Sequence, residues 1–223
     1  MLTCASFFQC FDESSASMLF SAHQLSCIRS DRVLFEQLDF AIDAGQIWQI
    51  AGRNGAGKSS LLRILAGLAE PIEGELRYKN QPLTQVQDEF ATNLCFIGHL
   101  SGVQPQLTAL ENLAFWRACY ALKPADDWAL LAQLGLAGLE DIPCQNLSAG
   151  QHRRVSLARL WLTAAQLWIL DEPFTALDVS AIAQLRQRFI EHCQHGGAII
   201  LTTHQALDLP EIPVQQLTLE YRW

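Results

Sequence analysis

The chain has 223 residues, of which 50% are hydrophobic and 17% are charged, a composition that indicates a folded domain rather than a disordered chain. Its formal net charge is −8 and it has no long basic run, which argues against nucleic acid as a partner. No stretch reaches the roughly 18 consecutive apolar residues of a membrane span, and no basic region precedes an apolar stretch at the N-terminus. We therefore expect no spanning helix and no secretory signal, so that any membrane role comes through a partner.

The N-terminal part of the chain divides at Met18. Residues 1–17 are rich in Ser, Phe and Cys, and Met18 directly precedes the first expected strand. We expect this segment to be either a disordered extension or the product of a misassigned start. Residues 19–28 and 32–42 alternate apolar and polar side chains, which predicts antiparallel strands, and residues 75–78 predict another after a turn.

A phosphate-binding loop is predicted at residues 52–59, which read G-x-x-x-x-G-K-S. An apolar strand is expected before it, at 46–51, and a helix after it, at 60–67. In this setting backbone N–H groups and the helix N-terminus can bind phosphates, Lys58 can reach the terminal phosphates, and the Ser59 hydroxyl can ligate Mg²⁺. The expected ATP-binding residues here are Gly52, Asn54, Gly55, Ala56, Gly57, Lys58, Ser59 and Ser60.

The middle of the chain reads as a strand followed by helices. Residues 93–97 form an apolar run typical of a core strand. Thr108 and Glu111 have the spacing of a capping box, which predicts a helix over 110–121. A second helix is expected over 126–134, where a glycine follows.

The pentapeptide 147–151, Leu-Ser-Ala-Gly-Gln, precedes an apolar helical run at 155–162. Ser148 and Gly150 open a helix, so a hydroxyl and backbone N–H groups could meet a γ-phosphate there. Taken alone, the same residues could be an ordinary helix start, because Ser148 is a good N-cap.

Two acidic residues follow an expected buried strand at 166–170. Open α/β sheets place ligands at the carboxyl ends of their strands. After a phosphate-binding loop, we therefore expect Asp171 to hold Mg²⁺ through water and Glu172 to act as general base on the attacking water. A helix is expected over 179–195, and another buried strand runs through 199–203 into His204.

The order of these motifs resembles the ATP-binding subunits of ABC transporters, from about Met18 to the end of the chain. The resemblance implies an α/β P-loop NTPase fold with an antiparallel β subdomain and a helical subdomain at about 99–150 that touches a membrane subunit. It makes 175–178 the D-loop and His204 a γ-phosphate contact. It also implies a shared site, in which ATP on one copy meets the 147–151 signature of a second copy. Ser148, Gly150 and Gln151 are the residues expected to bind ATP in this way.

Two positions depart from the family pattern. The family has a glutamine that helps to hold Mg²⁺ where this chain has His99, and imidazole is a poor ligand for that ion. His99 could contact Mg²⁺ through a water molecule, or Gln104 could reach the metal site after a shift of the loop. An aromatic residue normally stacks on adenine where this chain has Arg29, whose guanidinium can also stack on a base.

Segments around Cys27, His99, the 147–151 signature and 167–174 are most similar to the CcmA-type family, the haem-exporter ATPases of bacterial cytochrome c maturation. This resemblance implies a peripheral subunit on the cytoplasmic face of the inner membrane. It would bind integral membrane partners and use ATP and Mg²⁺ to release a haem-loaded chaperone. The alternatives are the ATPase of another ABC exporter, a soluble ABC-type ATPase, and a nucleotide sensor without catalysis.

The cysteines do not suggest a covalent framework. Their odd number and irregular spacing argue against disulfides or a zinc site, and most are expected to be small core residues. The sequence His-Cys-Gln-His at 192–195 could suggest a metal site, but a solvated helix end is the preferred interpretation. The seven cysteines are Cys4, Cys10, Cys27, Cys95, Cys119, Cys144 and Cys193.

Overall fold

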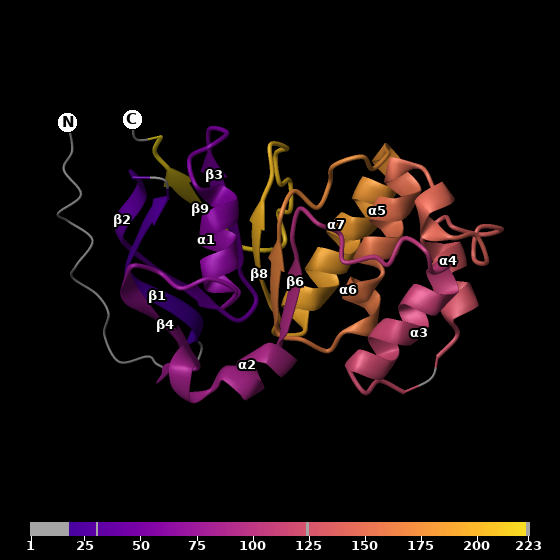
Figure 1. The fold of residues 1–223 in the computed structure, drawn as a ribbon, viewed down its shortest axis with the longest axis horizontal. Coiled ribbons are helices and arrows are strands. Elements are labelled where there is room, and N and C mark those ends of the chain that lie inside the picture. The colour runs from indigo at the N-terminus through magenta and orange to yellow at the C-terminus, as the bar shows by residue number, and fades with distance from the viewer. Residues whose placement is uncertain (1–17, 30, 124, 222–223) are drawn as a thin grey trace.

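Two β-sheets lie side by side and a group of helices flanks the second one (Figure 1). The computed structural model describes residues 18–29, 31–123 and 125–221. The expectation about residues 1–17 lies outside this described part. No helix in the described ranges combines the length and the apolar character needed to cross a membrane.

The first sheet is antiparallel and has the strand order β2-β1-β4-β5. Its strands are β1 (Met18–Arg29), β2 (Arg32–Asp43), β4 (Glu73–Tyr78) and β5 (Gln81–Pro82). β1 pairs with both β2 and β4 in antiparallel register. The alternating pattern at 19–28 and 32–42 is thus confirmed as a pair of antiparallel strands, because it puts one apolar face onto the core.

The second sheet is parallel throughout, with the order β6-β7-β8-β3-β9. Its strands are β3 (Ile47–Gly52), β6 (Leu94–Ile97), β7 (Leu167–Leu170), β8 (Ala198–Thr202) and β9 (Val214–Leu219). The four predicted strands β3, β6, β7 and β8 are confirmed, whereas β9 was not predicted. Its two glutamines are exposed at the edge of the sheet, so it lacks the apolar run of its neighbours.

The parallel sheet is covered on both faces. Leu167 and Ile169 of β7 pack into a core shared with the antiparallel sheet and helix α1 (Lys58–Leu65). Trp168 and Leu170 point to the opposite face, where they pack against helix α7 (Val179–Gln194). Burial on both faces explains why these strands read as continuous apolar runs.

A third core holds the remaining helices together. It contains residues of α3 (Ala109–Cys119), α4 (Asp127–Gln133), α5 (Ala149–Leu157) and α6 (Arg159–Leu162). Both expected helices at 110–121 and 126–134 are present. α3 begins one residue earlier and ends two residues earlier than expected, α4 is shorter by one residue at each end, and the predicted capping box at α3 is complete. The subdomain limits at about 99 and 150 stay a prediction, since α5 and α6 contribute to the same core beyond them.

Four short elements and one interruption were not predicted. Besides strand β5, the chain forms helix α2 (Gln87–Thr92) and the 3₁₀ turns η1 (Leu83–Gln85) and η2 (Cys144–Asn146). The apolar helical run expected at 155–162 is interrupted at Ala158, where α5 ends and α6 begins.

Burial dominates the chemistry of the cysteines. Four of the five in the described ranges are buried and free, and only Cys119 is exposed, which confirms the expectation that most are core residues. Burial raises the pKa of Cys95 to about 11 and that of Cys193 to about 12, so both remain neutral thiols. Cys4 and Cys10 lie outside the part of the chain that the structure describes.

The expectation of a solvated helix end at 192–195 was wrong for His192. Its ring lies 3.6 Å from that of Trp168 in a stacked arrangement, and its Nε2 is 3.2 Å from the carbonyl oxygen of Gln166. A Cβ on Gly197 would come within 2.2 Å of this ring, so glycine leaves the space that the imidazole fills. Burial, helped by the charge of Arg188, lowers the pKa of His192 from about 6.5 to about 4.

Because the folded chain resists protonating His192, we expect its stability to fall as pH drops from about 6.5 towards about 4. In that window the unfolded chain binds a proton at His192 that the folded chain does not bind. The free energy of unfolding should therefore fall by up to about 1.4 kcal/mol for each pH unit. Chemical unfolding at several pH values should show a shallower acid slope for His192→Gln than for the natural chain. His195→Gln, at the exposed end of the same helix, is the control, and an unchanged slope in His192→Gln would contradict this account.

Candidate functional site

The loop between β3 and α1 is shaped by glycines that no other residue could replace without strain. Gly55 and Gly57 have φ values of 80° and 100°, which side chains rarely adopt. A Cβ on Gly57 would lie 3.0 Å from Leu34, and one on Gly52 would lie 2.6 Å from the carbonyl oxygen of Leu219. The loop can therefore pass close to its neighbours and wrap around a ligand at the N-terminus of α1.

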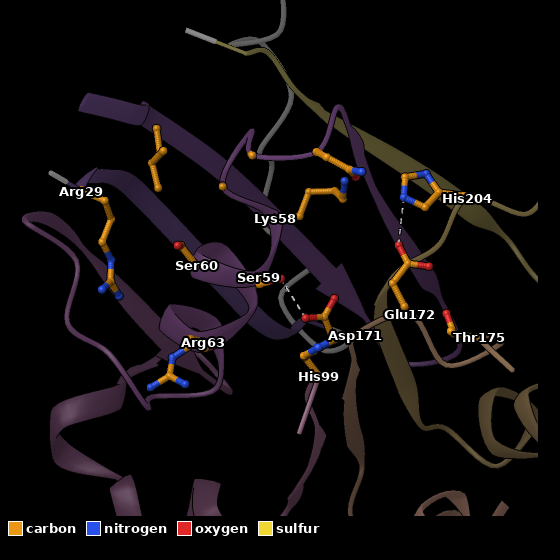
Figure 2. Close-up of a pocket in the computed structure, with 14 residues that line it drawn as sticks. Arg29, Lys58, Ser59, Ser60, Arg63, His99, Asp171, Glu172, Thr175 and His204 are labelled. Carbon is orange, nitrogen blue, oxygen red and sulfur yellow. Dashed lines mark hydrogen bonds and ion pairs between the residues drawn. The ribbon is translucent and has the colours of Figure 1, made fainter. Parts of the chain in front are cut away.

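Lys58 begins α1 and turns back across this loop (Figure 2). Its Nζ donates a hydrogen bond of 2.7 Å to the carbonyl oxygen of Gly52 and a longer one of 3.4 Å to that of Arg53. The ammonium group thus lies inside the curve of the loop, where phosphate oxygens would be stronger acceptors than carbonyls.

Asp171 connects the loop helix to the strand ends. The Ser59 hydroxyl donates to Asp171 Oδ2 at 2.8 Å, and the Thr202 hydroxyl donates to Asp171 Oδ1 at 2.6 Å. Asp171 is only 8% exposed, and its backbone N–H donates to Ile97 at the end of β6. A hydroxyl and a carboxylate in contact form an oxygen donor set, which is the kind that Mg²⁺ prefers.

Glu172 and His204 face each other beside this pair (Figure 2). His204 Nε2 lies 3.4 Å from Glu172 Oε1. The Glu172 backbone has a φ of 48°, and its N–H donates to the Thr202 hydroxyl at 2.9 Å. This unusual backbone angle turns the carboxylate away from the buried strand, so that its side chain is 30% exposed and can meet water.

Two supporting residues were missed by the sequence analysis. Thr202 holds Asp171 and Glu172 through one hydroxyl, and Arg153 Nη2 donates 2.9 Å hydrogen bonds to the carbonyl oxygens of both. Burial and then nearby Arg159 lower the pKa of Arg153, while the two carboxylates oppose this shift. A polar residue at the end of a buried strand was the available signal for Thr202, but nothing local marks Arg153.

Lys58, Ser59, the two carboxylates and His204 border one cavity of about 850 Å³, whereas Thr202 and Arg153 support it from outside. The predicted site residues that line it are Arg29, Asn54, Gly55, Gly57, Lys58, Ser59, Ser60, His99, Asp171, Glu172 and His204. Gly52 and Ala56 shape the loop without lining the cavity, and Gly52 contributes the carbonyl that Lys58 binds. The structure therefore gathers the loop, both carboxylates and His204, although their roles toward a nucleotide remain predictions.

The signature residues lie elsewhere in the chain's own structure. Ser148 Oγ accepts from the Gln151 N–H at 3.3 Å, and Gln151 Oε1 accepts from the Ser148 N–H at 2.9 Å. This capping box confirms the helix start, but Ser148, Gly150 and Gln151 do not line the cavity. A Cβ on Gly150 would lie 2.7 Å from the carbonyl oxygen of Ala176, so the helix start packs tightly against residues 175–178, the expected D-loop. ATP contact by the signature stays a prediction that needs a second copy.

The two departures from the family pattern both line the cavity. His99 lies near Asp171, while Arg29 lies at the end away from Glu172 and His204 (Figure 2). Gln104 does not line it. Its backbone is held by Asn112, whose side chain accepts from the Gln104 N–H at 2.8 Å and donates to its carbonyl at 3.1 Å. That His99 helps to hold a metal ion and that Arg29 stacks on adenine both remain predictions.

Comparison with known proteins agrees with this geometry. The family model described as ABC transporter matches residues 35–175. The chain belongs to the ABC transporter family. This ABC chain is 56% identical to the cytochrome c biogenesis ATP-binding export protein CcmA of Idiomarina loihiensis, over 94% of its own length and 96% of the relative. It is 51% identical to the protein of the same name from Escherichia coli, over 90% of its length and 96% of that relative.

Solved structures confirm the expected fold of the ABC chain. An ATP-binding subunit of an ABC transporter superposes with a TM-score of 0.75 at 28% identity, covering 83% of this chain and 79% of the other. A dimeric ATP-binding cassette in a post-hydrolysis state, bound to ADP and Pi, gives a TM-score of 0.72 at 22% identity, covering 84% and 88%. The second likeness shows the fold alone. The predicted α/β P-loop architecture with an antiparallel sheet and a helical part is therefore confirmed.

Replacing Lys58 with alanine should weaken ATP binding about 10- to 100-fold, since a charged hydrogen-bond donor is lost from the loop. Titration calorimetry on the full chain would measure the affinity. Lys79→Ala is the matched control, because Lys79 pairs with Glu89 at 3.0 Å and does not line the cavity. An unchanged ATP affinity in Lys58→Ala would remove Lys58 from the phosphate site.

Proposed function

We propose that this chain is the ATP-hydrolysing subunit of an ABC transporter complex for haem export in cytochrome c biogenesis, where it drives release of a haem-loaded chaperone. One observation supports the hydrolytic part above all others. Lys58, the Ser59–Asp171 pair and the Glu172–His204 pair line a single cavity. The named relatives, export proteins of cytochrome c biogenesis, support the biological setting.

ATP would enter with its phosphates at the loop. Lys58 would exchange its carbonyl partners for the terminal phosphate oxygens, and the N–H groups at the start of α1 would bind the rest of the phosphate chain. The oxygen donors of Ser59 and Asp171 fit Mg²⁺, which would neutralise phosphate charge when bound. His99 offers nitrogen, so it fits this ion less well and would act through water.

Glu172 would take the proton from the attacking water. Its carboxylate is partly exposed to the cavity, and its backbone is fixed by Thr202 and Arg153, so that the base is held in one position. His204, at 3.4 Å from the carboxylate, would orient Glu172 and contact the γ-phosphate.

The signature residues of this chain would serve the site of a second copy. They do not line its own cavity, and one chain carries one loop and one signature, so two copies would complete two sites. ATP would place negative charge at the shared seam, which favours closure, and hydrolysis would reverse it. The solved cassette of the same fold that is bound to ADP and Pi is itself dimeric.

Integral membrane subunits are the other proposed partners. The helical group at about 99–150 would dock on them, which would hold the chain peripherally at the cytoplasmic face of a bacterial inner membrane. The ATPase of another ABC exporter would use the same nucleotide chemistry and differ in this docking surface. A soluble ABC-type ATPase acting on nucleic acid is less well supported, because the net charge is −8. A pure nucleotide sensor would need neither Glu172 nor His204.

Glu172→Gln should abolish turnover while leaving ATP binding intact. The amide keeps the shape of the side chain but cannot accept a proton, so we expect the ATPase rate to fall about 100-fold or more. The exposed Glu211→Gln variant is the control for loss of one carboxylate. Equal loss of binding and turnover would contradict the assignment of Glu172 as general base.

The same variant tests the biological setting. Source cells whose only copy carries Glu172→Gln should lack covalent haem in their c-type cytochromes on a haem-stained gel, while other membrane transport remains intact. Normal cytochromes in these cells would overturn the cytochrome c proposal and assign the ATPase to another transporter.

A further inference from the structure

The segment that ends the sheet lies directly on the phosphate-binding loop. Strand β9 pairs with β3 up to the partners Gly52 and Leu219, and Tyr221 follows two residues later. A Cβ on Gly52 would lie 2.6 Å from the Leu219 carbonyl oxygen, and one on Gly55 would lie 3.4 Å from Tyr221 Cε2. The chain around β9, yellow beside β3 in Figure 1, thus touches the loop at its start and at its tip.

Arg32, at the start of β2, joins Tyr221 to the loop. Its Nη1 donates a 2.9 Å hydrogen bond to the Tyr221 hydroxyl, and its guanidinium lies 4.4 Å from the centre of the tyrosine ring. Its Nη2 donates to the carbonyl oxygen of Gly55. The guanidinium of Arg53, on the loop itself, lies 6.0 Å from the same ring. Two cations and the loop backbone therefore surround one aromatic side chain.

These contacts determine how one peptide group of the loop is turned. The carbonyl of Gly55 and the N–H of Ala56 belong to the same trans peptide and point in opposite directions. With the carbonyl held by Arg32, the Ala56 N–H points back into the loop and donates to Arg53 at 3.1 Å. The same Arg53 carbonyl and that of Gly52 hold Lys58. The contacts of Arg32 and Tyr221 with Gly55 thus fix the orientation of the loop groups that would face phosphate.

We propose that Arg32 and Tyr221 are positioning residues, which clamp the phosphate-binding loop in its nucleotide-ready shape before ATP arrives. Neither side chain lines the cavity, so their action goes through the loop rather than through direct contact with the nucleotide. A loop that is already ordered loses less conformational freedom on binding, which raises affinity. This inference rests on the proposed function, since it takes the ligand of the cavity to be ATP.

The clamp predicts an effect on ATP affinity that is separate from turnover. Tyr221→Ala should raise the Kd and KM for ATP about 5- to 20-fold, with kcat changed less than about twofold, because the catalytic groups keep their contacts. Tyr221→Phe keeps the ring against Gly55 and Arg32 and should retain most of the affinity. Arg32→Lys keeps the charge but replaces the planar fork, whose two nitrogens bind the hydroxyl and the carbonyl separately, with one ammonium on a differently shaped side chain, so it should resemble Tyr221→Ala.

A double-mutant cycle distinguishes a clamp from two separate effects. If the residues act as one unit, Arg32→Ala with Tyr221→Ala should weaken ATP binding no more than the worse single variant. Tyr120→Ala, on the helical group, is the matched control and should bind ATP normally. Unfolding temperatures identify any variant that fails to fold. If an alanine variant does not fold, the ATP affinities of Tyr221→Phe and Arg32→Lys test the clamp in its place: Tyr221→Phe should bind ATP nearly normally and Arg32→Lys more weakly.

Each outcome bears on a different claim. If the natural chain does not bind ATP, the proposed function is overturned. If the natural chain binds ATP and the Tyr221→Ala and Arg32→Lys variants bind it with unchanged affinity, the clamp is overturned but the proposed function is not. Additive losses in the double variant, or a fall in kcat at unchanged KM, would also overturn it.

Discussion

The carboxylate of Asp171 is the contact on which the rest of the site depends. Its two oxygens accept from Ser59 on the loop helix and from Thr202 at the end of β8, while its backbone N–H reaches β6. Through its side chain and its backbone, one buried residue therefore connects the loop helix to the ends of β6 and β8. Removing this carboxylate would leave the hydroxyl groups of Ser59 and Thr202 without this acceptor.

The layered core explains why the reactive groups collect at one edge. The central strands β7 and β8 are buried on both faces, and their side chains are apolar up to the last residue of the strand. Polar residues follow where these strands end, and parallel strands end at the same edge of the sheet. Asp171, Glu172 and His204 follow two adjacent strands, and Lys58 follows a third by way of the loop. The fold thus concentrates charge at the carboxyl edge of the sheet.

The parts of the structure that the sequence predicted correctly have local causes. Glycines, the capping box at Thr108, the N-cap Ser148 and apolar runs act within a few residues, which is why the loop, the helix starts and four of the five parallel strands were predicted. The missed features depend on distant partners. Arg153 is recognisable only through carbonyls 18 and 19 residues away, and His192 only through its stack on Trp168. Strand β9 was not predicted because an edge strand can expose its glutamines and so lacks a continuous apolar run.

The most direct test of this account is the Mg²⁺ dependence of ATP affinity in the natural chain and in Asp171→Asn. If Ser59 and Asp171 form the metal-binding part of the site, Mg²⁺ should tighten ATP binding to the natural chain. The same ion should have much less effect on Asp171→Asn, whose affinity for metal-free ATP should stay close to that of the natural chain. An Asp171→Asn variant that responds fully to Mg²⁺ would contradict the central role given to this carboxylate.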